Sequence, residues 1–393
     1  MKKRTFLYIP LVLLFALAMT ALVQSAYALG YEVSLVVNFD EENIVIEKLK
    51  ANESLVIYQD EKDSWINKET QENEREELKK LNSQLLLPIG AKNELAGLIS
   101  LSPKLSEEPF TPNDLRLLKL VASQTGFALE NSRLTETIAR EAAQKERLNR
   151  ELEIAREVQE RLFPQELPPI EGVDYYGACR SALDVGGDYY DFLEFADGKF
   201  GIAIGDISGK GIGASLMMAS LQASLRGQSL HFKDDLAGLL AQMNSLLYDA
   251  STSNRYATFF YSQYDPKTRK LSYVNAGHNP PFLLRPKNDD FEILTLAEGG
   301  AVVGMLPPML VSYKQGEIQL KKGDLIVGST DGITEAMNPK EEEWGEEAMV
   351  GELRKVHEKS AKEILEYIVS KADEFAAGAK QHDDMTMIVV KII

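Results

Sequence analysis

Four short acidic motifs, each beside an apolar run typical of a β-strand, constrain the fold of this chain more than any other feature. The motifs are GGDYYD at Gly186–Asp191, GDISGKG at Gly205–Gly211, STDGITEA at Ser329–Ala336 and QHDDMT at Gln381–Thr386. In FGIAIGDISGKG and DLIVGSTDG a strand-like run leads directly into Asp206 and Asp331, whereas Asp383 comes just before the run MTMIVV. Because antiparallel neighbours bring such strand ends to one edge of a sheet, the pattern predicts that these acids meet.

Carboxylates that converge from distant parts of a chain are typical ligands of hard divalent cations. Mg²⁺ and Mn²⁺ prefer oxygen ligands and keep several waters, so a few aspartates are enough to hold two ions. Two such ions can activate a water and neutralise a phosphoryl group, whose hydrolysis is very slow without a catalyst. The motifs therefore predict a two-metal site for phosphate ester hydrolysis, although any single Asp-Gly pair would indicate only a turn.

Composition argues against several other classes of protein. The chain has 393 residues, 44% of them hydrophobic, which is typical of globular material in two or three domains. Its formal charge is −17, and we find no dense stripe of Lys and Arg outside one helical segment, so we expect no nucleic acid as a partner. The single cysteine, Cys179, excludes an intramolecular disulfide and a Cys-rich zinc site.

The N-terminus predicts a membrane segment. The basic residues Lys2–Arg4 precede an uncharged stretch over residues 5–31, which is long enough to cross a bilayer as a helix. We therefore expect residues 1–30 to be a transmembrane helix of a single-pass protein whose catalytic domain lies on the cytoplasmic side. A signal peptide cleaved near the AYA of Ala26–Ala28 is the alternative. The basic residues by themselves would place the catalytic domain outside the cell, unless further helices precede this sequence.

Residues 31–130 have the pattern of a small α/β unit. Apolar runs at Ser83–Gly90 and Leu95–Leu101 predict strands, and Thr111 predicts a helix N-cap with Pro112 at the first helical position. Together, LLLPIG, LAGLISLSPK and FTPNDLRLLKLVASQTGFALENSRL resemble the C-terminal half of a GAF domain, a sensory module. The resemblance implies a partial GAF-like sensor domain, and the sequence predicts no particular ligand for it.

A long helix is predicted to follow, because residues 127–162 lack glycine and proline. We expect a linker helix over residues 131–165 that ends at Pro164. Spacings of four and three define a heptad seam, apolar at both ends and polar in the middle. The seam consists of Phe127, Asn131, Leu134, Ile138, Glu141, Lys145, Leu148, Leu152, Ala155, Gln159 and Leu162. It predicts either a parallel coiled coil that joins two copies in a homodimer, which we favour, or a helix packed on its own domain.

Residues 166–393 are expected to form the largest domain, of the α+β class. Strand-like runs outnumber helical stretches, and a turn such as Asp265-Pro266 favours antiparallel pairing. The runs are Phe200–Ser208, Ala257–Asp265, Lys270–Gly277, Pro281–Pro286, Asp324–Gly332 and Asp384–Ile392. The helical stretches are Gly213–Arg226, Asp235–Asp249 and Glu346–Phe375. We therefore predict two packed sheets flanked by helices.

Taken together, residues 149–393 resemble the PPM family of metal-dependent protein phosphatases, in the SpoIIE/RsbU branch. The matching stretches, in the family's order, are IAREVQERLFP, DVGGDYYDF, GDISGKGIGASLMMA, YATFFYSQYD, LSYVNAGHNPP, GDLIVGSTDGITEA and DDMTMIVV. The resemblance implies a PPM β-sandwich and a serine/threonine phosphatase that uses two Mn²⁺ or Mg²⁺ ions. It also implies a substrate, phosphoserine on a STAS-domain anti-sigma antagonist, and hence a part in sigma-factor regulation.

The resemblance also implies roles for individual residues. Asp188 and Asp206 match the ligands of the second metal, with Asp206 bridging both ions and the backbone carbonyl of Ile207 as a further ligand. Asp331 and Asp383 match the ligands of the first metal. Asp206 and Asp188 are therefore also the expected catalytic residues.

This sequence departs from the family pattern where the substrate phosphate binds. Eukaryotic members carry a histidine after the bridging aspartate and an arginine that holds the phosphate, and neither stands in the matching motifs here. We expect Lys210 to bind the phosphate instead. His278 is expected to have a structural role in a turn, and His382 to orient the aspartate beside it. Asp384 is expected to support the ligands, and Asp191 to reach a metal-bound water.

Two other functions match parts of the sequence. GGDYYDF resembles the GGDEF signature of diguanylate cyclases, but it differs at the two positions after the aspartate, and GDISGKG and DDMT have no counterpart there. The second alternative is a catalytically weak pseudophosphatase that acts as a signalling binding module. The missing arginine favours that alternative, and the intact metal-binding aspartates argue against it.

Overall fold

The chain divides into two units, Met1–Arg147 and Leu148–Ile393. The structure is a computed structural model, and it describes residues 33–36, 44–51, 55–56, 65–70, 72–80, 82–91, 94–104, 106–232, 234–250, 255–288 and 290–393.

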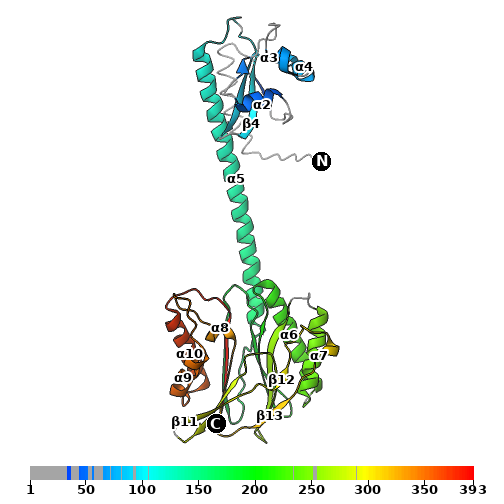
Figure 1. The fold of residues 1–393 in the computed structure, drawn as a ribbon, viewed down its shortest axis with the longest axis vertical. Helices are drawn as coiled ribbons and strands as arrows, with labels where there is room; N and C mark the ends of the chain where they lie inside the picture. The colour runs from blue at the N-terminus through cyan, green and yellow to red at the C-terminus, as the bar shows by residue number, and fades with distance from the viewer. Residues whose placement is uncertain are drawn as a thin grey trace. The chain divides into compact units, whose positions relative to one another are not determined.

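The C-terminal unit is built on two sheets (Figure 1). One sheet has the strand order β11-β10-β14-β15-β5 and is antiparallel throughout. Its strands are β5 (Val173–Arg180), β10 (Phe282–Lys287), β11 (Asp290–Thr295), β14 (Leu325–Ser329) and β15 (Met385–Ile392). The other has the order β12-β9-β8-β7-β6, with β13 also paired to β9. Its strands are β6 (Tyr189–Glu194), β7 (Phe200–Ile207), β8 (Ala257–Asp265), β9 (Lys270–Ala276), β12 (Gly299–Gly300) and β13 (Gly316–Gln319).

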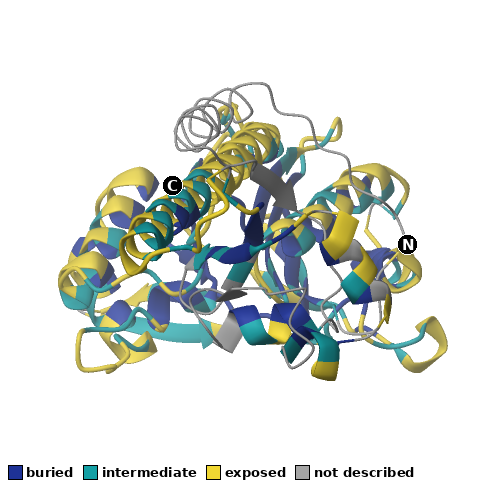
Figure 2. Cartoon of the chain, turned by 90° about the horizontal axis from the view of Figure 1, so that it is seen from above, coloured by how far each residue is buried: buried dark blue, intermediate teal, exposed yellow. Residues whose placement is uncertain are grey.

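Helices cover the outer face of each sheet. α6 (Ile212–Phe232) and α7 (Leu236–Ala250) pack on the sheet that contains β7, and α9 (Glu346–Val356) and α10 (Ala361–Ala376) pack on the sheet that contains β15. A third apolar core fills the space between the two sheets. Figure 2 shows the strands mostly buried and the outer faces of the helices mostly exposed. The predicted α+β arrangement of two packed sheets flanked by helices is confirmed.

Strand β7 shows how burial on both faces is encoded in the sequence. Ile202 and Ile204 pack between the sheets, whereas Ala203 and Ile207 face the core under α6 and α7. A strand covered on both sides needs apolar residues at successive positions and not only at alternate ones. This is why β7 has the continuous apolar run FGIAIG directly before Asp206.

The structure corrects one helix prediction in this unit. The stretch Glu346–Phe375 forms two helices, α9 and α10, and not a single one. Ser360 caps the second of them, because its hydroxyl accepts a hydrogen bond from the Glu363 backbone while the Glu363 side chain bonds back to Ser360. This reciprocal capping box starts a new helix where the sequence composition suggested continuity.

The N-terminal unit contains a four-stranded sheet in the order β1-β4-β3-β2. The strands are β1 (Val33–Val36), β2 (Leu55–Val56), β3 (Leu85–Ala91) and β4 (Glu94–Leu101), and the short helices are α2 (Ile44–Ala51), α3 (Trp65–Glu69) and α4 (Glu72–Lys80). One apolar core lies between this sheet and α2, α3 and α4, and a second lies between the sheet and the start of α5. The two predicted strands correspond to β3 and β4.

Helix α5 (Pro112–Glu160) has 49 residues and contributes to both units. Its predicted start is confirmed, because Asp114 accepts a hydrogen bond from the Thr111 backbone at 2.8 Å while its own backbone N–H bonds to the Thr111 hydroxyl at 3.3 Å. The hydrogen bond from Lys104, followed by those from the Thr111 backbone and hydroxyl to the carboxylate, lowers the pKa of Asp114 to about 2. The predicted linker helix is thus confirmed as a helix, and it begins earlier than expected.

The predicted heptad seam is only partly available to a second chain. Large apolar side chains are exposed along much of α5. They are Leu117, Leu120, Phe127, Leu134, Ile138, Leu148, Ile154 and Val158. Gln159, however, is only 6% exposed, and Leu162 packs against the core of the C-terminal unit. The last two positions of the seam are therefore used within the chain's own fold.

The prediction of a single-pass membrane protein is corrected. Among the described residues, no helix is both long enough and apolar enough to cross a membrane. α5 has the length, but its middle is rich in charged side chains, which are costly in a bilayer. The expected span, residues 1–30, lies outside the described residues.

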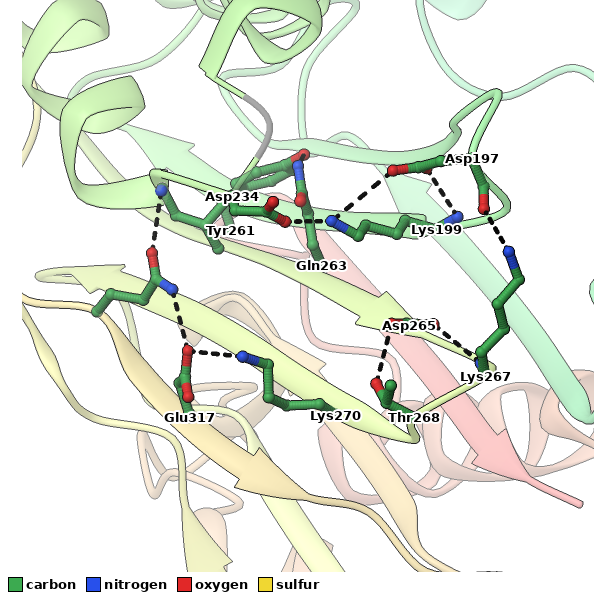
Figure 3. Close-up of polar contacts among 12 residues, drawn as sticks. Asp197, Lys199, Asp234, Tyr261, Gln263, Asp265, Lys267, Thr268, Lys270 and Glu317 are labelled. Atoms are coloured by element: carbon green, nitrogen blue, oxygen red, sulfur yellow. Dashed lines mark hydrogen bonds and ion pairs between the residues drawn. The ribbon is translucent and has the colours of Figure 1, made fainter.

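Ion pairs tie down the end of β7 that lies opposite Asp206 (Figure 3). Lys199, just before the strand, pairs with Asp234 in the connection between α6 and α7 and lies 3.7 Å from Asp197. On a neighbouring pair of strands, Lys270 lies 3.0 Å from Glu317. At this end of the sheet each of these acids therefore has a cation beside it.

Candidate metal centre

Strand pairing brings the acids of the four motifs together. β6 and β7 are antiparallel neighbours, so Asp188, just before β6, lies beside Asp206 near the end of β7. β14 and β15 are also antiparallel neighbours, so Asp331, just after β14, lies near Asp383, just before β15. The two pairs come from different sheets, and their charges act on one another, as the pKa of Asp206 shows below.

Asp188 and Asp206 form the buried part of the cluster. Asp188 is 2% exposed, and burial followed by the nearby charge of Asp206 raises its pKa well above the usual value. Burial, followed by the charges of Asp331 and Asp383, raises the pKa of Asp206 to about 7. A contact between the Asp188 and Asp206 carboxyl groups partly offsets that rise. Four carboxyl groups, from four motifs on two pairs of strands, thus share one electrostatic environment.

Asp331 and Asp383 form the more accessible part. Asp331 is the first residue of the short helix α8 (Asp331–Thr334), and burial together with the charge of Asp383 raises its pKa. The ammonium of Lys210 lies 3.0 Å from Asp383 and also donates to the His382 backbone carbonyl. Lys210 therefore contacts a proposed metal ligand, and His382 contributes its main chain to this contact.

The loop before β6 leaves room for the Ile207 carbonyl. A Cβ atom added at Gly187 would lie 2.9 Å from the Ile207 carbonyl oxygen and 3.6 Å from Asp206 Oδ1. Because Gly187 has no side chain, the Asp188 loop can approach both of these oxygens closely. The same face thus presents a backbone carbonyl next to the carboxylates.

Asp384 holds the main chain of the Asp188 loop. Its Oδ2 accepts a hydrogen bond from the Gly187 backbone at 2.7 Å, and its Oδ1 accepts one from the Ala182 backbone at 2.7 Å. Gly186 must be small here, because an added Cβ would lie 2.4 Å from Asp384 Oδ2. Asp384 therefore supports the loop through its backbone, in keeping with the supporting role expected for it.

Thr330 is a contributor that sequence reasoning missed. It is fully buried, and its hydroxyl donates to Asp188 Oδ2 at 2.8 Å and accepts from the Thr386 backbone N–H at 3.0 Å. The side chain thus fixes one oxygen of Asp188 relative to β14 and β15. The only available signal was its position in STDG, directly before Asp331.

The donor set fits divalent cations in its chemistry. It combines carboxylates with one backbone carbonyl, the oxygen ligands that Mg²⁺ and Mn²⁺ prefer. Burial first, and then the charges of neighbouring carboxylates, raise the pKa values of Asp188 and Asp206, and a bound cation would offset both effects. Among the described residues, no group of three or more acids, histidines or cysteines already lies at ligand distance from one point. Side chains would therefore have to shift to close around an ion.

Two further predicted residues make structural contacts. Asp191 is fully buried and forms two hydrogen bonds of 2.8 Å with Arg226 of α6, so it anchors that helix to β6. His278 stands in a turn that Asn275 closes through bonds to its N–H and carbonyl, and burial lowers the His278 pKa to about 4. Its ring contacts the Thr258 hydroxyl at 3.0 Å. These contacts agree with the structural role expected for His278.

Comparison with known proteins then identifies the family. The family model described as Stage II sporulation protein E (SpoIIE) matches residues 196–393, about half of the chain. The chain belongs to the SpoIIE family. A second model, a GAF domain, matches residues 16–131, which confirms the predicted GAF-like domain; the match begins inside the segment expected to span a membrane.

Two curated proteins are similar to this SpoIIE-family chain over most of its length. It is 29% identical over 298 residues to phosphoserine phosphatase RsbU of Bacillus subtilis, covering 74% of this chain and 82% of RsbU. It is 28% identical over 291 residues to protein IcfG of Synechocystis, covering 67% of this chain but only 45% of IcfG. The chain thus spans less than half of IcfG.

A solved structure supports the fold. The SiaA-PP2C domain of Pseudomonas aeruginosa matches with a TM-score of 0.55 at 20% identity, covering 64% of this chain and 99% of that domain. The C-terminal unit has the fold of that PP2C domain. As a SpoIIE-type domain it is a PPM-type protein phosphatase domain, and its relative RsbU is named a phosphoserine phosphatase. This family membership favours a phosphatase over a diguanylate cyclase.

Proposed function

We propose that this chain is a serine/threonine phosphatase that uses two Mn²⁺ or Mg²⁺ ions to hydrolyse phosphoserine on a STAS-domain anti-sigma antagonist, and so regulates a sigma factor. The observation that carries the proposal is the convergence of carboxylates from four separate motifs at one edge of the sandwich. The relationship to RsbU, a phosphoserine phosphatase, supports the substrate class. The domain limits proposed are 31–130 for the sensor, 131–165 for the linker and 166–393 for the phosphatase.

The proposed ligands are those that the family resemblance implies, and contacts among their side chains support them. Asp188, Asp206 and the Ile207 carbonyl would hold one ion, and Asp331, Asp383 and Asp206 the other, with Asp206 between them. When bound, the two ions would lower the pKa of a water and neutralise the phosphate oxygens. This division is supported by the contact of Asp188 with Asp206 and by the charge of Asp331 and Asp383 acting on Asp206.

Other residues of the chain would hold the metal ligands and the substrate phosphate in place. Thr330 and Asp384 hold the Asp188 carboxylate and its loop, so that the ligand is fixed before substrate arrives. Lys210 lies at the accessible side of the cluster, beside Asp383, where its ammonium can reach a phosphate oxygen. His278 is buried and held neutral by its surroundings, so it is not suited to donate a proton to the leaving serine.

We also propose a homodimer through α5. The exposed apolar side chains from Leu117 to Leu148 are unusual for a surface helix, and a second α5 would cover them. Charge substitutions at Phe127 and Leu134 are expected to convert a dimer into a monomer in analytical ultracentrifugation. A wild-type chain that sediments as a monomer at micromolar concentration would rule this out.

The decisive experiment is a phosphatase assay on the full chain. Manganese-dependent release of phosphate from an aryl phosphate is measured for wild type and for Asp206→Ala, with and without a chelator. We expect release by wild type only, and only with metal. Faster release from a phosphorylated STAS-domain protein than from a phosphoserine peptide of the same sequence would support the proposed substrate.

The alternative is a pseudophosphatase that serves as a binding module. If this alternative holds, the folded wild-type protein will bind manganese or a phosphoprotein but will release no phosphate. That outcome would reject the proposed turnover while leaving the family assignment intact.

A further inference from the structure

The last turn of α5 contacts the loop that carries Asp188. Gln159 is the penultimate residue of this helix, and its side chain is 6% exposed. Its amide nitrogen donates to the Gly186 carbonyl at 2.7 Å, and its amide oxygen accepts from the Gly186 N–H at 3.0 Å. One side chain thus satisfies both polar groups of a buried residue that stands two positions before Asp188.

The remaining contacts of this helix end keep Gln159 in place. Phe163, just beyond the helix, stacks on Tyr190 of β6 with ring centroids 5.3 Å apart. Leu162 packs into the core under α6, and the Gln222 side chain reaches the Leu162 carbonyl at 3.5 Å. The end of α5 is therefore wedged against the first strand after the ligand loop, and it cannot move without moving Gln159.

The ligand loop is held from two sides. Asp384, just before β15, accepts a hydrogen bond from the Gly187 N–H. Gln159 of α5 bonds to both the carbonyl and the N–H of Gly186. Buried peptide groups are costly to leave without partners, so this loop has little freedom while both holders are in place. Removing one holder would release the peptide that sets the direction of Asp188.

We infer that Gln159 is a positioning residue for the metal centre, and that α5 acts on the phosphatase through this side chain. The inference rests on the proposed function, because Asp188 is taken there as a metal ligand. A displacement of α5 would break the two bonds to Gly186, loosen the loop and weaken metal binding. A helix that only packed on the core would have no such route to a ligand.

The test replaces Gln159 in the full chain. Gln159→Met keeps the length and helix propensity but removes both hydrogen bonds, and Gln159→Glu keeps the acceptor for the Gly186 N–H but loses the donor. The matched control is Gln165→Met, an exposed glutamine that bonds only to the carbonyls of Glu160 and Phe163. Manganese affinity is measured by calorimetry.

We expect Gln159→Met to bind manganese about 10- to 100-fold more weakly, as is usual when a partner behind a ligand is removed, with Gln159→Glu in between and Gln165→Met unchanged. Saturating manganese should restore most phosphatase turnover in Gln159→Met, because the side chain does not contact substrate. Hydrogen exchange at the backbone of residues 185–188 should quicken in Gln159→Met while exchange in β7 stays slow.

The contrary results are distinct. Equal manganese affinity in wild type and Gln159→Met, or unchanged exchange at residues 185–188, would overturn the inference. Faster exchange throughout β7 would show that Gln159 serves the fold in general, which would also overturn it. A wild type that binds no manganese and releases no phosphate would instead reject the proposed function, and the exchange measurement would still report whether Gln159 holds the loop.

Discussion

The acidic residues near the two ends of strand β7 have opposite electrostatic environments. At the end that carries Asp206, carboxylates are gathered in partial or complete burial, and their pKa values rise. At the start of the strand, Lys199 pairs with Asp234, and this hydrogen bond raises the lysine pKa. Nearby, the hydrogen bond from Lys270 lowers the pKa of Glu317.

This difference distinguishes acids that we propose to bind metal from acids that only contribute surface charge. Exposed acids with cationic partners contribute little and are inexpensive to keep, because water screens them. Buried acids that repel one another destabilise the fold unless something positive joins them. The proposed cation would relieve this repulsion at the end that carries Asp206, whereas the acids near the start of β7 already have cationic partners.

The largest expected effect comes from neutralising one acid at each end. Asp188→Asn should lower metal-dependent phosphate release about a thousandfold, or about 4 kcal/mol of barrier, because a ligand oxygen is lost. Asp197→Asn should leave the rate within about twofold of wild type. In the absence of metal, Asp188→Asn should melt no lower than wild type, since one repelling carboxylate is gone. Comparable rate losses in both variants would contradict the claim that only the acids near Asp206 take part in the reaction.

A smaller effect is expected from pH, through His278. Its pKa falls from the usual 6.5 to about 4 in the folded protein, so the unfolded chain takes up a proton in this window that the folded chain does not. Stability should therefore be complete above about pH 6.5 and fall by about 3 kcal/mol by pH 4.

The measurement is urea unfolding at pH 7 and pH 4. The difference in unfolding free energy between these pH values should be about 3 kcal/mol smaller in His278→Gln than in wild type. His231→Gln, at an exposed histidine, serves as the control and should behave as wild type. An identical pH dependence in all three proteins would contradict the burial of a neutral imidazole at the catalytic end.

The smallest effect is expected at the paired end. Lys199→Met removes an ion pair whose Asp234 partner is 80% exposed, so the unfolding free energy should fall by no more than about 1 kcal/mol. The difference should shrink in 1 M salt, and metal-dependent turnover should not change. A loss of manganese affinity in this variant would show that the two ends of β7 are energetically coupled. The ion pair would then contribute to metal binding and not only to stability.

Much of the fold was predictable because its signals are local. The run FGIAIG before Asp206 has no polar side chain because both faces of β7 are covered, and Thr111-Pro112 starts α5 through a cap that needs only neighbouring residues. The break between α9 and α10 was missed, since the Ser360 capping box competes with a composition that favours helix throughout. The membrane prediction relied on hydropathy alone, and it concerned residues that the structure does not describe.

The candidate site was predictable to the extent that it consists of motifs. Asp188, Asp206, Asp331 and Asp383 were each marked by strand-end patterns, but the roles of their neighbours were not. Asp191 lies three residues from Asp188 and pairs with Arg226 instead, because successive strand residues face opposite sides.

The sequence by itself determined which residues we propose to carry the chemistry, since carboxylates beside apolar runs are visible in one dimension. Only the tertiary structure decided what holds them. Thr330, Asp384 and Gln159 reach Asp188 or its loop across 142, 197 and 27 residues of chain. Contacts of that kind depend on how sheets and helices pack, and packing brings together residues whose positions along the chain bear no relation to one another.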